Sequence, residues 1–176
     1  MKMSTKELET QLDRNLSLMK QIEFDRKLEA MINDLRKNAD NQEKLAEETE
    51  KQQKPIEQLV DNQEKINQKA DSLSKPLKAL EKEGKQLETP ADLGNTGQKQ
   101  DSISKNLTDS KKQLEEKKNK EASGSQKKAA KHMKELAQQR EDSQQENESE
   151  QLEEDAANIR MILENLVRLS FDQEDL

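Results

Sequence analysis

One stretch of the chain repeats apolar or small residues at alternating steps of three and four positions, without a break in register. This spacing returns to the same side of a helix every seven residues, so it predicts a long helix whose single narrow stripe packs against another helix. Pro76 lies inside the stretch and predicts a kink in that helix, not a break. Because Gln63, Ala70 and Gly84 fill such a stripe poorly, we expect close backbone approach or a weak contact there. The stripe consists of Ile56, Leu59, Gln63, Ile66, Ala70, Leu73, Leu77, Leu80, Gly84 and Leu87.

The first 54 residues contain neither Gly nor Pro, which together with similar spacing predicts one helix over about residues 4–52. The register slips near Ile22, so that two stripes follow one another. Pro55 removes a helical hydrogen bond and pushes Lys54 toward extended backbone, so we expect a tight turn here; a kink in a continuous helix is the alternative. The first stripe is Leu8, Leu12, Leu16 and Met19, and the second is Phe24, Leu28, Met31, Leu35, Ala39, Gln42, Ala46 and Thr49.

Gly and Pro residues between positions 89 and 97 predict a loop over 89–100 that follows a second helix over 56–88. A third helix is expected over 101–138, with Ile103, Leu107, Ser110 and Leu114 on one side and a candidate hinge at Ser123-Gly124-Ser125. The very polar residues 138–149 are expected to fray or to loop, and a shorter fourth helix is expected over 150–170.

Composition limits how these helices assemble. Hydrophobic residues make up 28% of the chain, charged residues 39% and aromatic residues 1%, whereas a compact globule needs about 45–50% apolar residues. Narrow seams between long helices need far less apolar material. The sequence therefore predicts an all-α fold: an elongated antiparallel helical bundle or coiled coil of three long helices plus a shorter C-terminal helix, forming one domain over residues 1–176.

We expect no enzyme activity. The single His132 lies among Lys128, Lys131 and Lys134, where no orienting partner is expected. The sequence has no Cys for thiolate metal sites, no Gly-containing oxygen-ligand loop, and no phosphate-binding loop, since Gly94-Asn95-Thr96-Gly97 lacks the Lys-Ser/Thr ending. Catalytic, cofactor, metal and small-molecule sites are therefore not expected.

The C-terminal segment carries more apolar residues than one seam between two helices can cover. We therefore expect it to bind a protein partner or a second copy of the chain. The candidate interaction face consists of Ile159, Ile162, Leu163, Leu166, Val167, Leu169 and Phe171. No apolar run approaches the roughly 18 residues of a membrane span, so membrane attachment is expected only through segments outside this chain.

The Lys-rich helix over 105–134 gives an alternative function, binding of an anionic membrane or nucleic-acid surface. Residues 97–134 carry 11 Lys or Arg and 5 Asp or Glu, whereas residues 135–176 carry 3 and 13. The Lys-rich segment has no Arg and no aromatic side chain to read or stack bases, so nucleic acid is not the expected partner. Pairing with the acidic segment 135–155, or with a neighbouring acidic helix, is favoured.

The stretch from Ile159 to Leu176, with the strongest likeness over Ile162–Leu176, resembles a family of large, membrane-anchored helical proteins of unknown function from the Bacteroidetes. Ser125–Leu136 and Glu43–Thr49 are also similar to that family. The resemblance implies an internal piece of a longer protein of the cell envelope, on the periplasmic side, without established catalytic residues. Together with the residue patterns, it leads us to expect a structural or protein-interaction module that acts as a helical spacer or docking surface.

Overall fold

The structure is a computed structural model that describes residues 5–91, 93–94 and 96–174. It contains four helices, α1 (Thr5–Glu50), α2 (Ile56–Gly84), α3 (Gly97–Glu115) and α4 (Asn119–Glu174), and no strand within the described residues. The predicted all-α class is therefore confirmed.

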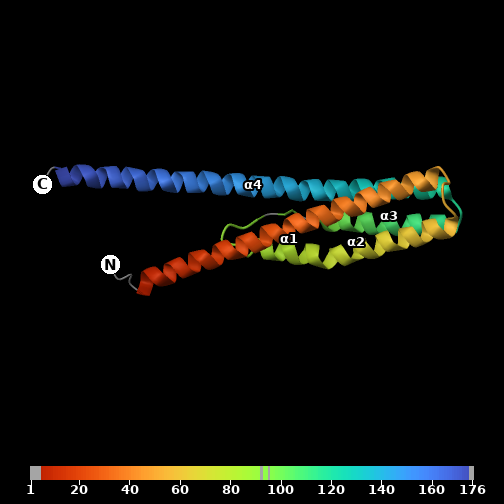
Figure 1. Cartoon of the computed structure of the whole chain (residues 1–176), viewed down its shortest axis with the longest axis horizontal. Coiled ribbons are helices and arrows are strands. Elements are labelled where there is room, and N and C mark those ends of the chain that lie inside the picture. Colours follow the sequence, from red (N-terminus) through yellow and green to blue (C-terminus); the bar gives the residue numbers. More distant parts are fainter. Residues whose placement is uncertain (1–4, 92, 95, 175–176) are drawn as a thin grey trace.

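The chain reverses direction between successive helices, so that the four helices lie along a common long axis (Figure 1). Ion pairs between α1 and α4 fix their relative register: Arg36 pairs with Glu141, Glu43 with Lys134, and Glu50 with Lys127. Each advance of seven residues in α1 thus matches a retreat of seven in α4, which is the repeat of a helix seam.

The core follows the stripes that the sequence predicts. In the stripe between residues 56 and 87, eight of the ten side chains are buried, and Ile56 and Ala70 are half-buried against them. The second stripe of α1, from Phe24 to Thr49, is buried at all eight positions, and so are the four predicted positions of α3. Pro76 lies inside α2 without ending it, as expected.

A glutamine layer crosses the middle of this core. Gln42 of α1, Gln63 of α2 and Gln126 of α4 are fully buried. Gln42 and Gln63 each donate Nε2 to the other's Oε1 at 2.9 Å, and Gln126 Nε2 also donates to Gln63 Oε1 at 2.9 Å. Buried amides need such partners, because an unpaired one loses its hydration without compensation. The layer therefore favours one register of these three helices over others.

The predicted turn before Pro55 is confirmed, because α1 ends at Glu50 and α2 begins at Ile56. Gln52 has a positive φ of 52°, and the amide of Gln53 donates to the carbonyl of Glu48 at 3.0 Å. This left-handed residue, followed by a hydrogen bond that reaches back five positions, is the usual way to end a helix.

A second turn of the same kind corrects the predicted third and fourth helices. The helix expected over 101–138 is interrupted at 116–118, where Lys117 has a φ of 59° and the amide of Lys118 donates to the carbonyl of Gln113 at 2.8 Å. From Asn119 onward α4 continues to Glu174, so residues 138–149 neither fray nor loop and no separate helix begins at 150. Gln and Glu dominate that stretch, and both are good helix formers. The hinge expected at Ser123-Gly124-Ser125 lies instead inside the first turns of α4.

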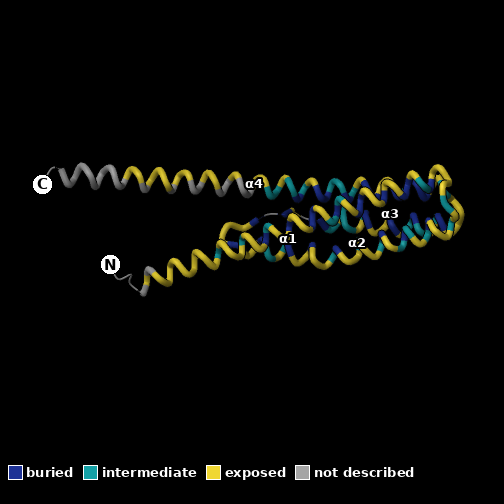
Figure 2. The backbone as a smooth tube through the Cα atoms, viewed as in Figure 1, coloured by how far each residue is buried: buried dark blue, intermediate teal, exposed yellow. Residues whose placement is uncertain are grey.

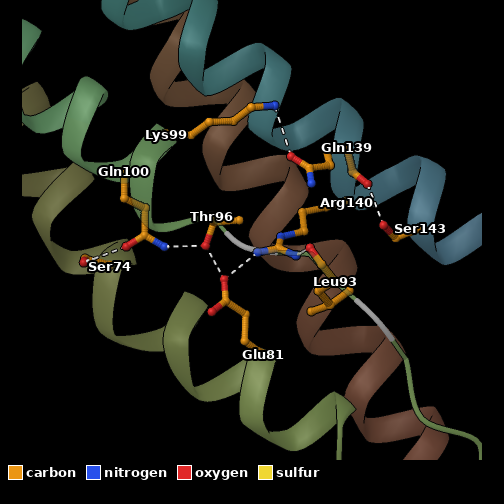
Figure 3. A network of polar contacts seen from close by, with 9 residues as sticks. All are labelled: Ser74, Glu81, Leu93, Thr96, Lys99, Gln100, Gln139, Arg140 and Ser143. Atoms are coloured by element: carbon orange, nitrogen blue, oxygen red, sulfur yellow. Dashed lines mark hydrogen bonds and ion pairs between the residues drawn. The ribbon is translucent and has the colours of Figure 1, made fainter.

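The loop between α2 and α3 spans residues 85–96, four residues earlier than expected. Arg140 of α4, which is fully buried, holds it in place by donating to the backbone carbonyl of Leu93 and to Glu81 of α2 (Figure 3). The hydroxyl of Thr96 donates to the same Glu81 carboxylate, and Gln100 Nε2 donates to Thr96 Oγ1 at 2.9 Å. A charged group this deep is stable only with such partners.

Candidate interaction surface

Two helical segments extend beyond the packed part of the molecule, and we name them the arms. The α1 arm comprises residues 5–23, and the α4 arm comprises residues 145–174. The core ends near Phe24. The ring of Phe24 packs against Gly84, the last residue of α2, so α2 does not extend far enough to cover α1 before Phe24. In Figure 2 both arms are coloured mostly as exposed where they are described, and in Figure 1 they draw apart toward the end that carries both termini.

The arms carry the exposed large apolar side chains of the described chain, and each of these is 46–70% exposed. On the α1 arm they are Leu8, Leu12, Leu16, Leu18, Met19 and Ile22, and on the α4 arm Leu152, Ile159, Met161 and Leu163. Scattered single apolar residues are ordinary on a protein surface, but a row along one side of a helix marks a docking face. On the α4 arm Leu152, Ile159 and Leu163 form such a row, whereas Met161 lies on the other side of the helix.

The prediction that the first stripe of α1 packs in the bundle is therefore wrong. At about 100° per residue, the five positions from Met19 to Phe24 make one full turn plus about 140°. Met19 therefore lies more than a third of a turn around the helix from the buried side that begins at Phe24. On α4, the twelve positions from buried Arg140 to exposed Leu152 make three full turns plus about 120°. Leu152 therefore lies about a third of a turn around the helix from Arg140. Both arms thus direct their apolar rows away from the side on which the bundle is packed, so these rows are not a frayed continuation of the core.

Two residues of the candidate interaction face predicted from the sequence have described side chains, and both are exposed. Ile159 is 59% exposed and Leu163 is 56% exposed. The side chains of Ile162, Leu166, Val167, Leu169 and Phe171 lie outside the described residues. The sequence analysis did not predict the α1 arm as a second exposed face, although the register slip near Ile22 was the signal for it.

The Lys-rich segment 105–134 is not one continuous helix. The turn at 116–118 divides it between α3 and α4, which run in opposite directions. Several of its lysines pair with acids of other helices, namely Lys111 with Glu64, Lys127 with Glu50, and Lys134 with both Asp40 and Glu43. Pairing with neighbouring helices, one of the two alternatives favoured from the sequence, is therefore observed. The acids of these pairs belong to α1 and α2 and not to residues 135–155.

These pairs change the pKa of their members. A side-chain hydrogen bond from Lys127, supported by its charge, lowers the pKa of Glu50. A hydrogen bond to Glu64 raises the pKa of Lys111, and a hydrogen bond to Glu43 raises the pKa of Lys134. All lie at the surface, so they act as register markers more than as strong bonds.

The chemistry of the described residues offers little else. His132 has a partner after all, because its Nδ1 lies 3.3 Å from Oε2 of Glu135, one turn along α4. No group of three or more His, Cys, Asp or Glu side chains that could hold a metal ion gathers in the part of the chain that the structure describes. A cavity of about 160 Å³ between α2 and α3 is lined largely by core side chains such as Leu73, Leu77 and Leu107.

The fold and surface define the chain as an all-helical bundle with two apolar arms. Comparison with protein-family models, with curated proteins and with solved structures finds no match to it. None of the helices, over the residues described, contains an apolar stretch of the length that a bilayer crossing requires.

Proposed function

We propose that this chain is a non-enzymatic structural and protein-interaction module: an elongated antiparallel helical bundle that serves as a spacer and docks other protein through its two arms. The observation that carries the proposal is the apolar row on each arm, with Leu12 and Leu152 both 70% exposed. Burying one such side chain fully is worth about 1.5–3 kcal/mol, so a row of them favours a bound protein over water.

The bundle itself suits the role of a rigid base for the arms. The glutamine layer and the buried pair of Arg140 with Glu81 fix one packing of the helices. The arms are direct continuations of α1 and α4, so the bundle holds their starting directions. The resemblance of Ile162–Leu176 to envelope proteins of the Bacteroidetes favours a place in the bacterial cell envelope, with any membrane attachment in segments outside this chain.

Site-specific photocrosslinking in cells tests the docking role. A photoreactive phenylalanine derivative replaces Leu12 or Leu163 on the apolar rows, or Thr10 or Ala157 on the opposite sides of the same arms. Covalent adducts with a polypeptide are expected from positions 12 and 163, and few from positions 10 and 157. Equal labelling at all four positions, or none, would count against docking through the apolar rows. Fractionation of the same cells tests the envelope location.

Binding of an anionic surface through residues 105–134 is less well supported, because these residues are divided between two helices and several lysines already have acidic partners. Retention on heparin or on anionic vesicles at low salt, abolished by about 0.2 M salt, would favour that alternative.

A further inference from the structure

We infer that the protein docked on the arms is a second copy of this chain, so that the arms of two copies lie alongside each other in opposite directions. This inference rests on the proposed docking role and names its partner. Two observations carry it: the amount of apolar surface that the arms expose, and the order of charges along them.

The α1 arm, residues 5–23, is shorter than the α4 arm, residues 145–174, and can lie along part of it. Continuing the register of Arg36 with Glu141 and Glu43 with Lys134 places the start of α1 at Thr5 level with residue 172, two residues before α4 ends at Glu174. Turning a second copy end for end lets the α1 arm of each copy lie along residues 154–172 of the other copy's α4 arm.

The exposed apolar surface has the size that a stable dimer needs. Ten large apolar side chains of the arms are each about half to two-thirds exposed. Covering the eight of them that lie on the rows within residues 5–23 and 154–172 would bury roughly 800 Å² per chain, or about 1,600 Å² in total, and specific protein interfaces bury about 1,200–2,000 Å² or more. The rows cannot cover each other within one copy, because both turn away from the packed side of the bundle.

The charges agree with this overlap. It aligns residues 5–23 of one copy with residues 154–172 of the other, in the same direction. Lys6 then lies within two residues of the level of Glu153, and Glu9 within two residues of the level of Arg160. Arg14 lies next to Glu164 in the same alignment. All six side chains are exposed, so each is available to a partner.

The apolar rows also meet in this alignment. Leu12 of one copy lies at the level between Ile159 and Leu163 of the other, and these three side chains are 70%, 59% and 56% exposed. Because the arrangement has two-fold symmetry, the same contacts occur twice.

Sedimentation equilibrium over a wide range of concentration tests the inference with the full chain. Reversible association to twice the chain mass of 20.3 kDa is expected. The variant L12D/L163D places a carboxylate in each row and is expected to raise the dimer dissociation constant at least a hundredfold. The variant T10D/A157D adds the same charge on the opposite sides of the arms and is expected to change it less than about threefold. Circular dichroism at each stage checks that the helices remain.

Charge exchange tests the alignment itself. Lys6 and Glu153 lie near opposite ends of the arms within one copy, so only a second copy brings them together. K6E and E153K are each expected to weaken the dimer about three- to tenfold, and K6E/E153K to restore it. Failure of the double variant to recover would overturn this alignment.

The outcomes separate the two proposals. A chain that remains monomeric at high concentration, while positions 12 and 163 crosslink to another protein in cells, overturns the second copy and leaves the docking role standing. A monomer without crosslinks overturns both.

Discussion

Arg140 of α4 donates from Nη2 to Oε1 of Glu81 in α2 at 2.7 Å, and the arginine is fully buried while the glutamate side chain is 23% exposed. The pair joins two helices that are far apart in sequence and also holds the loop before α3, through Leu93 and Thr96. Removing one member leaves the other charge largely desolvated.

Arg140→Met is therefore expected to lower the free energy of unfolding by about 3–5 kcal/mol, the usual cost of breaking a buried pair. The control is Arg36→Met, which breaks the more exposed pair with Glu141 and is expected to cost about 0–1 kcal/mol. Urea denaturation followed by circular dichroism measures both. Equal small losses would mean that the Arg140 pair contributes no more than a surface pair.

The glutamine layer gives a second prediction. Gln63→Leu leaves buried Gln42 and Gln126 without their shared partner, and we expect a loss of about 2–3 kcal/mol. The triple variant with Leu at positions 42, 63 and 126 is expected to recover that loss or exceed the original stability, because it removes all three buried amides of the layer together. Urea midpoints of the two variants decide the matter. A triple variant less stable than Gln63→Leu would contradict the reasoning.

Two glycines inside helices should respond in opposite ways to the same change. A Cβ at Gly84 would lie 2.9 Å from the carbonyl oxygen of Ala91 and 3.1 Å from the ring of Phe24, whereas nothing lies within 4 Å of a Cβ at Gly124. Gly84→Ala is expected to destabilise the fold by about 1–3 kcal/mol through overpacking. Gly124→Ala is expected to stabilise it by about 0.5–1 kcal/mol, because Ala loses less backbone entropy in a helix. Thermal melts measure both shifts, and shifts of the same sign would refute the assignment of Gly84 to a close contact.

The surface pairs predict a stability plateau between about pH 5.5 and 9.5. Glu50 and Glu64 have lowered pKa values, so their contribution is present above the ordinary value of 4.5 and is lost as pH falls through their folded pKa. Lys111 and Lys134 have raised pKa values, so their contribution is complete below the ordinary value of 10.5 and is lost as pH rises through their folded pKa. The slopes are expected to be shallow and to flatten in 1 M salt, because exposed pairs are screened. Melting temperature against pH at two salt concentrations measures this, and a maximum inside the plateau would contradict it.

The sequence predicts the buried stripes well, because a helix that packs along another helix needs apolar or small residues on one side at heptad spacing. The seam from Phe24 to Thr49 could be read residue by residue for this reason. Spacing places position 140 on the same stripe as Met133 and Leu136, but an arginine is not expected to be buried there, so the residue type hid this position. Spacing also does not show whether another helix covers a stripe. Leu8 and Leu12 have the spacing of a packed seam, but both are exposed.

The turn at 116–118 escaped prediction because no Gly, Pro or Asn residue occupies its left-handed position. Lys117 takes a φ of 59°, as Gln52 takes 52° at the other turn. An L-residue there costs about 1–2 kcal/mol relative to ordinary backbone, and the packing of α3 and α4 outweighs that cost.

Glycine removes this strain, so Lys117→Gly and Gln52→Gly are each expected to stabilise the fold by about 0.5–1 kcal/mol after the entropy cost of the glycine is subtracted. The controls are Lys118→Gly and Gln53→Gly, one residue later, where φ is not positive and glycine is expected to give no gain or a loss. Urea denaturation measures all four variants. Because the turns lie at the end of the bundle away from the arms (Figure 1), sedimentation of the two stabilised variants is expected to give the dissociation constant of the unsubstituted chain. A gain at position 118 equal to that at 117 would show that chain flexibility, and not relief of the left-handed strain, causes the effect.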